Sequence, residues 1–237
     1  MAKTTPTEQK KRNRWLKLFS VEVLVLLVLL FASVIIFVYA VNMVFIKKAT
    51  SFDETVFNYV ATHVSPGFTQ FMIIISFLGK HTFLIPANLT LLVFFIFIKK
   101  NRRFSVRVIS LALTSLAIMF LLKLSFQRTR PEIPLLEKVS GFSFPSGHAL
   151  MSVAFYGLMI YITWHEVKKA WLRNVLILLL LTLIFLIGYS RIYLRVHYAS
   201  DVMAGFAVGF GWLLLSLWMI HKIENRILTR RELAAKV

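Results

Sequence analysis

Six long apolar runs alternate with short polar segments along this chain of 237 residues. A helix that crosses the hydrocarbon core of a bilayer needs about 20 mostly apolar residues, and Lys or Arg at its ends can reach back to the interface. Six runs come close to that length or exceed it. The pattern therefore predicts an all-α bundle of six transmembrane helices over residues 19–46, 82–98, 105–123, 148–164, 171–189 and 202–220.

A shorter apolar segment, residues 66–79, is too short to cross alone and suits an interfacial or re-entrant helix. Just before it, residues 52–64 show helical amphipathic spacing, which predicts a helix on the outer surface. The distribution of Lys and Arg tests the topology. Six spans with a cytoplasmic N-terminus place 19 cations inside and 9 outside, whereas a seventh span at 66–79 gives 13 inside and 15 outside. The positive-inside rule favours six spans.

The composition agrees with a membrane protein. Hydrophobic residues make up 58% and charged residues 16%, with a mean hydropathy of +0.75, which argues against a soluble globular domain. The net charge of +18 then indicates an inner-leaflet anchor and no nucleic-acid partner. The absence of Cys excludes disulfides, thiolate nucleophiles and Cys-ligated metals. We expect a basic cytoplasmic tail over 1–18, a membrane domain over 19–221, a second cytoplasmic tail over 222–237, and no obligate protein partner.

Cations that break the positive-inside rule point to a ligand. The two outer segments 124–147 and 190–201, with the helix ends beside them, combine such cations with two histidines and a carboxylate. Cations placed against the topology rule, beside two histidines and a carboxylate, suggest selection for a ligand, and the ligand should be an anion. Lys123, Arg130 and Arg191 are suited to surround a phosphate, since Arg offers a bidentate fork and Lys a point charge.

The segment Pro145-Ser146-Gly147-His148 opens the fourth apolar run. Ser146 can cap that helix and leave free backbone N–H groups at its positive end, where an oxyanion binds. Gly147 lets the backbone approach a ligand closely. His197 and Asp201 are four residues apart, so on a helix the carboxylate can hold one ring nitrogen while the other attacks phosphorus. His148 then remains as the acid that protonates the leaving oxygen.

These residues form a recognisable set. Lys123-x6-Arg130-Pro131, Pro145-Ser146-Gly147-His148 and Ser190-Arg191-x5-His197-x3-Asp201 resemble, in order and without departure, the three-part signature of the type 2 phosphatidic acid phosphatase superfamily. The resemblance implies a helical bundle whose outer-face pocket dephosphorylates membrane lipid phosphates without a metal or other cofactor. It implies His197 as the nucleophile that forms a phosphohistidine, Asp201 as its partner and His148 as the general acid. The phosphate is then held by Lys123, Arg130, Ser146, Gly147 and Arg191.

The substrates that the resemblance suggests are phosphatidylglycerophosphate, undecaprenyl pyrophosphate and phosphatidic acid. Two other functions fit the same residues: a phosphotransferase that passes the phosphoryl group to another lipid, and a transporter that binds a head group without chemistry. A metal held by the two histidines and the carboxylate is disfavoured, because the flanking cations repel a divalent ion.

Some residues suit simpler interpretations. Arg128 and Arg195 are expected only to extend from helix ends to the interface. The Gly205-x3-Gly209 spacing, with Gly211, is typical of close helix packing.

Overall fold

The computed structural model describes residues 21–135 and 140–234, and every regular element within these ranges is helical. The predicted tail 1–18 lies outside the described residues. Short π-helical segments continue two of the α-helices. The elements are α2 (Val21–Val41), η1 (Asn42–Ile46), α3 (Ser51–Ala61), α4 (Pro66–Leu78), α5 (His81–Val93), η2 (Phe94–Ile98), α6 (Arg102–Phe126), α7 (Gly147–Glu166), α8 (Ala170–Tyr193) and α9 (Ala199–Ala234).

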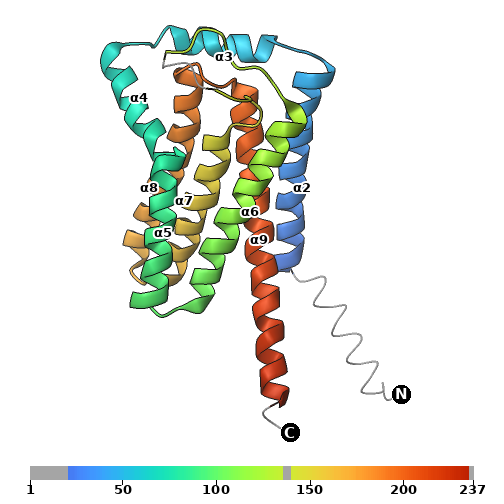
Figure 1. Ribbon diagram of the computed structural model, residues 1–237, viewed down its shortest axis with the longest axis vertical. Coiled ribbons are helices and arrows are strands. Elements are labelled where there is room, and N and C mark those ends of the chain that lie inside the picture. Colours follow the sequence, from blue (N-terminus) through green and yellow to red (C-terminus); the bar gives the residue numbers. More distant parts are fainter. Residues whose placement is uncertain (1–20, 136–139, 235–237) are drawn as a thin grey trace, which may run out of the picture.

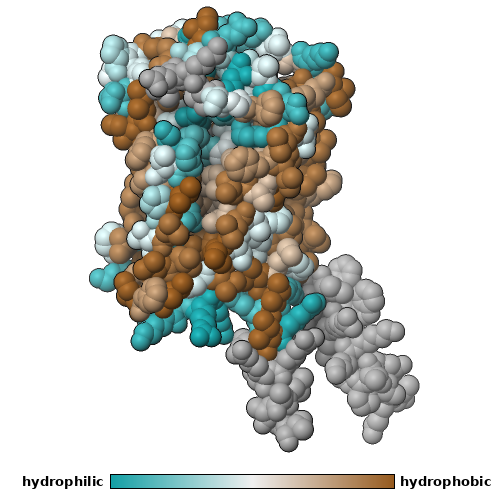
Figure 2. Space-filling view, viewed as in Figure 1, coloured by the Kyte–Doolittle hydropathy of each residue, from teal (hydrophilic) through white to brown (hydrophobic). Residues whose placement is uncertain are grey.

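Six of these helical segments are long and apolar enough to cross a membrane, which confirms the predicted spans. They are Val21–Ile46, His81–Ile98, Arg102–Phe126, Gly147–Glu166, Ala170–Tyr193 and Ala199–Ile227. Hydrophobic residues cover much of the side of the bundle, and hydrophilic residues gather at its two ends (Figure 2). The all-helical class is therefore confirmed. Helix α9 continues through residue 221 to Ala234 without a break, so the predicted C-terminal tail starts as part of this helix.

Helices α3 and α4 lie between the first two spans, as predicted. Helix α3 runs across one end of the bundle, which we call the α3 end (Figure 1). Helix α4 is a short apolar helix that descends from this end, packs against α8 and leads through a turn at Gly79 and Lys80 into α5. At 13 residues it is shorter than the six candidate spans, as the six-span topology requires.

Helix α7 is the central element of the bundle. In its most apolar stretch 61% of the residues are buried, compared with 6% in the first span, and α7 packs against α6, α8 and α9. The first span packs mainly on α9 and exposes most of its apolar side chains. Because bilayer chains solvate such side chains, only the middle of the bundle needs a protein core.

The contact between α7 and α9 is close because two glycines face α7. A Cβ built on Gly205 would lie 2.6 Å from the carbonyl oxygen of Ser146, and one on Gly209 would lie 2.8 Å from that of Leu150. Both neighbours are backbone oxygens of α7 or its N-cap, which cannot rotate out of the way as a flexible side chain can. The close packing predicted from the spacing of these two glycines is therefore confirmed, and it places the start of α7 directly against the start of α9.

We expect Gly205→Ala to lower stability, because the added methyl group must push α7 away from α9. Overpacking of this kind costs about 1–3 kcal/mol. The thermal unfolding midpoint of the purified protein in detergent should fall. Gly67→Ala is the matched control, because a Cβ at Gly67 meets nothing within 4 Å. Equal midpoints for Gly205→Ala and the wild type would contradict this account of the packing.

Candidate active site

Three separate parts of the chain meet at the α3 end of the bundle. They are the segment after α6, the first turn of α7, and the turn 194–198 that joins α8 to α9. The close packing of α7 on α9 sets the distance between two of them, because the backbone N–H of Ser146 donates to the carbonyl oxygen of Asp201 at 2.9 Å. Residues far apart in the sequence therefore form a single site.

His197 and Asp201 are paired, although the geometry differs from the expected one. Helix α9 begins at Ala199, so His197 lies in the preceding turn and does not share a helical face with Asp201. The turn instead folds back: the backbone N–H of Tyr198 donates to Asp201 Oδ2 at 2.9 Å, and His197 Nδ1 lies 3.5 Å from the same oxygen. Both side chains are buried, at 2% and 0% exposure.

The contacts of His197 fix which ring nitrogen carries the proton. Arg130 Nη1 lies 3.1 Å from Nε2, and a guanidinium can only donate, so Nε2 must accept. The proton of the neutral ring is then on Nδ1. This N–H points to Asp201 Oδ2 and to the hydroxyl of Ser143, 3.3 Å away, which itself donates to Asp201 Oδ2. The lone pair of Nε2 therefore faces the cations of the site.

Backbone carbonyl groups hold two of the predicted phosphate ligands in place. Arg130 donates through Nε to the carbonyl of Gly141 at 2.9 Å and through Nη1 to that of Val196 at 2.9 Å. Lys123 reaches from the last turn of α6 to the carbonyl of Phe142. Neutral carbonyls orient both cations without cancelling their charge, which leaves them available to an anion.

Arg191 brings the third predicted cation from the last turn of α8. It is 4% exposed, and its Nη1 donates to the hydroxyl of Ser76 on α4. Its Nε is buried and has no hydrogen-bond partner among the described residues. A buried guanidinium that meets a hydroxyl instead of a carboxylate keeps its positive charge uncompensated, which favours an anionic ligand.

The first turn of α7 has the expected cap. The backbone N–H of Ala149 donates to the hydroxyl of Ser146 at 3.4 Å, which confirms Ser146 as the N-cap. A Cβ on Gly147 would lie 2.6 Å from Met119 Sδ on α6, so this glycine lets α6 pass close by; its approach to a ligand stays a prediction. His148 follows and packs beside Gly79 of the turn between α4 and α5, within electrostatic range of His197 and Arg191.

The sequence did not predict every residue that contacts the pair. Ser143 lies two residues before Pro145 and bonds to both His197 and Asp201. Arg128, expected only to reach the interface, instead donates to Asp201 Oδ1 at 2.6 Å and to Asp53 Oδ2 at 2.8 Å. The one sequence signal for Arg128 is its position, two residues before Arg130 in an outer segment that already breaks the positive-inside rule.

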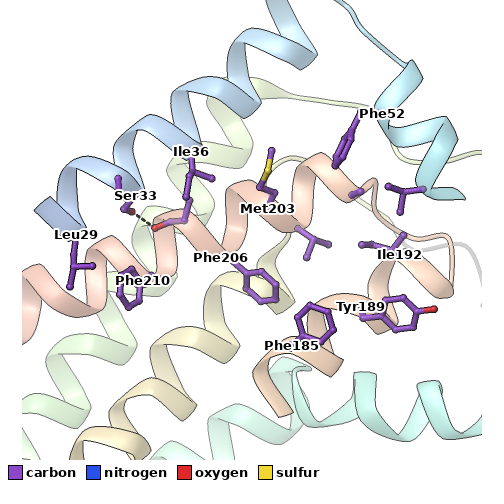
Figure 3. Close-up of a pocket in the computed structure, with 15 residues that line it drawn as sticks. Leu29, Ser33, Ile36, Phe52, Phe185, Tyr189, Ile192, Met203, Phe206 and Phe210 are labelled. Carbon is purple, nitrogen blue, oxygen red and sulfur yellow. Dashed lines mark hydrogen bonds between the residues drawn. The ribbon is translucent and has the colours of Figure 1, made fainter. Parts of the chain in front are cut away.

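A cavity of about 530 Å³ lies elsewhere, between α2, α8 and α9 under the edge of α3 (Figure 3). The described residues that line it are almost entirely apolar, and the hydroxyl of Ser33 among them donates to the carbonyl of Ala207. Within the described part of the chain none of the predicted site residues lines it. A phosphate needs cations and N–H donors, which these apolar walls do not offer.

Comparisons with known proteins identify the family of this chain. A family model described as the PAP2 superfamily matches residues 104–225. Phosphatidylglycerophosphatase B of Bacillus subtilis (strain 168) is 26% identical over 178 residues, which cover 75% of this chain and 85% of that protein. An undecaprenyl-diphosphatase of Sulfolobus acidocaldarius is 28% identical over 167 residues, which cover 66% and 75%.

The fold has a counterpart among solved structures. The crystal structure of a transmembrane PAP2 type phosphatidylglycerolphosphate phosphatase from Bacillus subtilis superposes with a TM-score of 0.74, over 82% of this chain and 96% of that one, at 24% identity. The matched fold and the six apolar helices define a multi-pass membrane protein. The chain belongs to the PAP2 superfamily, as its three motifs predicted.

The burial of His197 predicts how stability depends on pH. Burial lowers the pKa of His197 from 6.5 to about 3, against the opposing attraction of Asp201. The unfolded imidazole takes up a proton below about pH 6.5, and the folded one does not until near pH 3. Acid therefore stabilises the unfolded state, and the stability that His197 contributes above pH 6.5 is lost as the pH falls toward 3.

We expect the thermal unfolding midpoint in detergent to fall as the pH is lowered from 7 to 5. It should fall less in His197→Asn, because the asparagine side chain does not titrate. His165→Asn is the control, since it removes an exposed histidine at the far end of α7. A His197→Asn variant that loses as much stability as the wild type over this range would show that another group is responsible.

Proposed function

We propose that the protein hydrolyses the terminal phosphate of a membrane lipid phosphate or diphosphate, without a metal, through a phosphohistidine on His197. The observation that carries the proposal is the orientation of that imidazole. The Nδ1–H group of His197 faces Asp201 and Ser143, and the lone pair of Nε2 points to Arg130. A histidine held in this way is a nucleophile oriented by a carboxylate.

The first step is the transfer of the phosphoryl group to His197. The Nε2 lone pair attacks phosphorus, the bond to the leaving oxygen breaks, and His148 gives that oxygen its proton. Lys123, Arg130 and Arg191 and the N–H groups of the first turn of α7 bind the three equatorial oxygens, where the charge of the transition state lies. Asp201 stabilises the positive charge that develops on the imidazole.

The second step returns His197 to its starting state. Water attacks phosphorus, the N–P bond breaks, and the neutral His148 takes the proton from the water. The same residue thus serves as acid and then as base, which requires an imidazole with an accessible edge. His148 is less buried than His197, in keeping with a group that exchanges protons with the leaving group and with water.

The substrate class follows from the position of the site at one end of a membrane bundle. A lipid tail can remain in the bilayer beside the spans while only the head group enters the cationic pocket. The names of the relatives, a phosphatidylglycerophosphatase and an undecaprenyl-diphosphatase, support phosphatidylglycerophosphate and undecaprenyl pyrophosphate as the first substrates to test, with phosphatidic acid next.

A direct test is to trap the intermediate. Purified protein in detergent, given lipid substrate labelled at the terminal phosphate and quenched rapidly, should yield an acid-labile, base-stable phosphoenzyme. His197→Ala should carry no label, and His165→Ala should be labelled like the wild type. Release of inorganic phosphate should persist in EDTA. Equal labelling of His197→Ala, or loss of turnover on chelation, would overturn the mechanism, and label recovered in a second lipid would identify a phosphotransferase.

The proposed orientation has the site at the outer leaflet and both termini in the cytoplasm. Nineteen of the 28 Lys and Arg residues then lie on the inner side, as the positive-inside rule requires. The chain has no Cys, so single cysteines can report this directly. Gly67 at the α3 end and Lys168 between α7 and α8 are both exposed.

A membrane-impermeant maleimide should label Gly67→Cys in intact cells and Lys168→Cys only after the membrane is opened. Labelling of both cysteines after opening shows that both variants are reactive. The opposite pattern would place the site on the cytoplasmic face.

A further inference from the structure

We propose that Asp53 and Arg128 are positioning residues for the catalytic carboxylate, linking the surface helix α3 to the pair formed by His197 and Asp201. We call Asp53 and Arg128 the carboxylate strut. The inference rests on the proposed function, because it concerns how Asp201 is held against the nucleophile. Neither residue belongs to the three motifs that identified the family.

Arg128 bridges two buried carboxylates with the two arms of its guanidinium. Nη1 donates to Asp201 Oδ1 at 2.6 Å, and Nη2 donates to Asp53 Oδ2 at 2.8 Å. Nη1 also lies 2.8 Å from the hydroxyl of Ser200, and the guanidinium carbon is 4.0 Å from the centre of the Tyr198 ring. Two anions, a hydroxyl and an aromatic face thus fix the plane of the group, which a lysine ammonium cannot reproduce.

The two oxygens of Asp201 have separate partners. Oδ1 accepts from Arg128, whereas Oδ2 faces Nδ1 of His197, the hydroxyl of Ser143 and the N–H of Tyr198. Arg128 therefore determines which way the carboxylate is turned. Without it, Oδ1 loses its ion pair at a fully buried position, and the carboxylate is free to rotate away from the imidazole.

Asp53 ties this arrangement to α3 and to the start of α9. Its Oδ1 accepts the backbone N–H of Ser200 at 2.9 Å, and its Oδ2 accepts the hydroxyl of Ser200 at 2.7 Å as well as Arg128. One carboxylate thus binds the first turn of α9 and the arginine that orients Asp201. Asp53 is only 2% exposed although it lies on a surface helix, and a buried charge is retained only where it is well paired.

The apolar side of α3 explains how the helix reaches this position. Phe52 and Val56, on either side of Asp53 in sequence, line the cavity between α2, α8 and α9, which Figure 3 shows with Phe52 at its edge. Val60 packs in a core cluster with Tyr193 and Leu194 at the end of α8. Apolar contacts on both sides therefore hold α3 over the start of α9, with Asp53 facing Ser200.

The electrostatics of the strut agree with its geometry. Burial acts to lower the pKa of Arg128, but the charges and hydrogen bonds of Asp201 and Asp53 outweigh it, so the pKa is raised. Arg128 is therefore held charged between two anions. Arg128 donates to Asp201, the partner of the nucleophile. Arg130 differs, because its Nη1 faces Nε2 of His197, the nitrogen that attacks phosphorus.

The test compares Asp53→Asn, Arg128→Gln and Arg128→Lys with a matched control, Glu54→Gln. Glu54 is the next acidic residue on the same helix and is exposed, so the control removes the same charge without touching the strut. The measurements are kcat, KM, inhibition by inorganic phosphate, the rate of phosphoenzyme formation in a single turnover, and the thermal midpoint in detergent, each on the full-length protein.

We expect Asp53→Asn and Arg128→Gln to lower kcat and phosphoenzyme formation about 10- to 100-fold, a size typical of partners that orient a primary ligand in metal sites. Inhibition by inorganic phosphate should change less than threefold, since Lys123, Arg130 and Arg191 remain. Arg128→Lys should recover only part of the rate. The double variant Asp53→Asn/Arg128→Gln should lose little more than the worse single variant, because the two residues act as one unit.

Several results would overturn the proposal. Glu54→Gln should keep wild-type kinetics, and if it loses as much rate as Asp53→Asn the effect is one of surface charge. Equal losses in kcat and in phosphate binding, or a fall in rate explained by a fall in folded protein, would assign the strut a structural role only. If His197→Ala is inactive while both strut variants have normal activity, only the positioning role of Asp53 and Arg128 is contradicted. If His197→Ala still turns over substrate, the phosphohistidine mechanism itself is contradicted.

Discussion

The side chain of Asp201 is completely buried near the end of a membrane bundle, and the arrangement of the site depends on the bonds that stabilise its charge there. A carboxylate removed from water is costly unless it is paired and hydrogen-bonded. Asp201 obtains its partners from two stretches of chain: Arg128 and Ser143 after α6, and His197 and the backbone of Tyr198 in the turn before α9. Satisfying one buried charge thus brings together stretches of chain that are 73 residues apart in sequence.

The close packing of two helices supplies the scaffold for this convergence. Gly205 allows α9 to touch the backbone of Ser146, and the N–H of Ser146 in turn bonds to the carbonyl of Asp201. The capped, positive end of α7 is therefore fixed relative to the carboxylate by backbone contacts, which side-chain motion does not loosen. In a bilayer, where apolar side chains gain little by leaving the lipid, such small-residue contacts are what can hold helices together.

The sequence predicted the spans and the helix cap because these features depend on residues that are close together in the chain. Apolar runs of bilayer length gave the six spans, and the motif around Ser146 gave the cap of α7. The paired geometry of His197 and Asp201 was predicted for the wrong reason, since α9 begins only at Ala199. The roles of Asp53 and Arg128 were not predicted. Asp53 contacts Ser200, which is 147 residues away in the sequence, and such a contact produces no periodic pattern of residues. An arginine just past a helix end looks the same in sequence whether it reaches the interface or a buried carboxylate.

The charges of the site explain why these two residues and the predicted ligands have different tasks. Arg128 is shared between Asp53 and Asp201, whereas Lys123 and Arg130 bond to neutral carbonyl groups and Arg191 to a hydroxyl. Four cations around two carboxylates leave an excess of two positive charges among these six side chains. A phosphate monoester carries about −1.5 to −2 at neutral pH, which matches that excess. In the proposed mechanism, the strut thus balances the anion that orients the nucleophile, and the remaining cations have no carboxylate partner, so that the substrate itself completes the pairing.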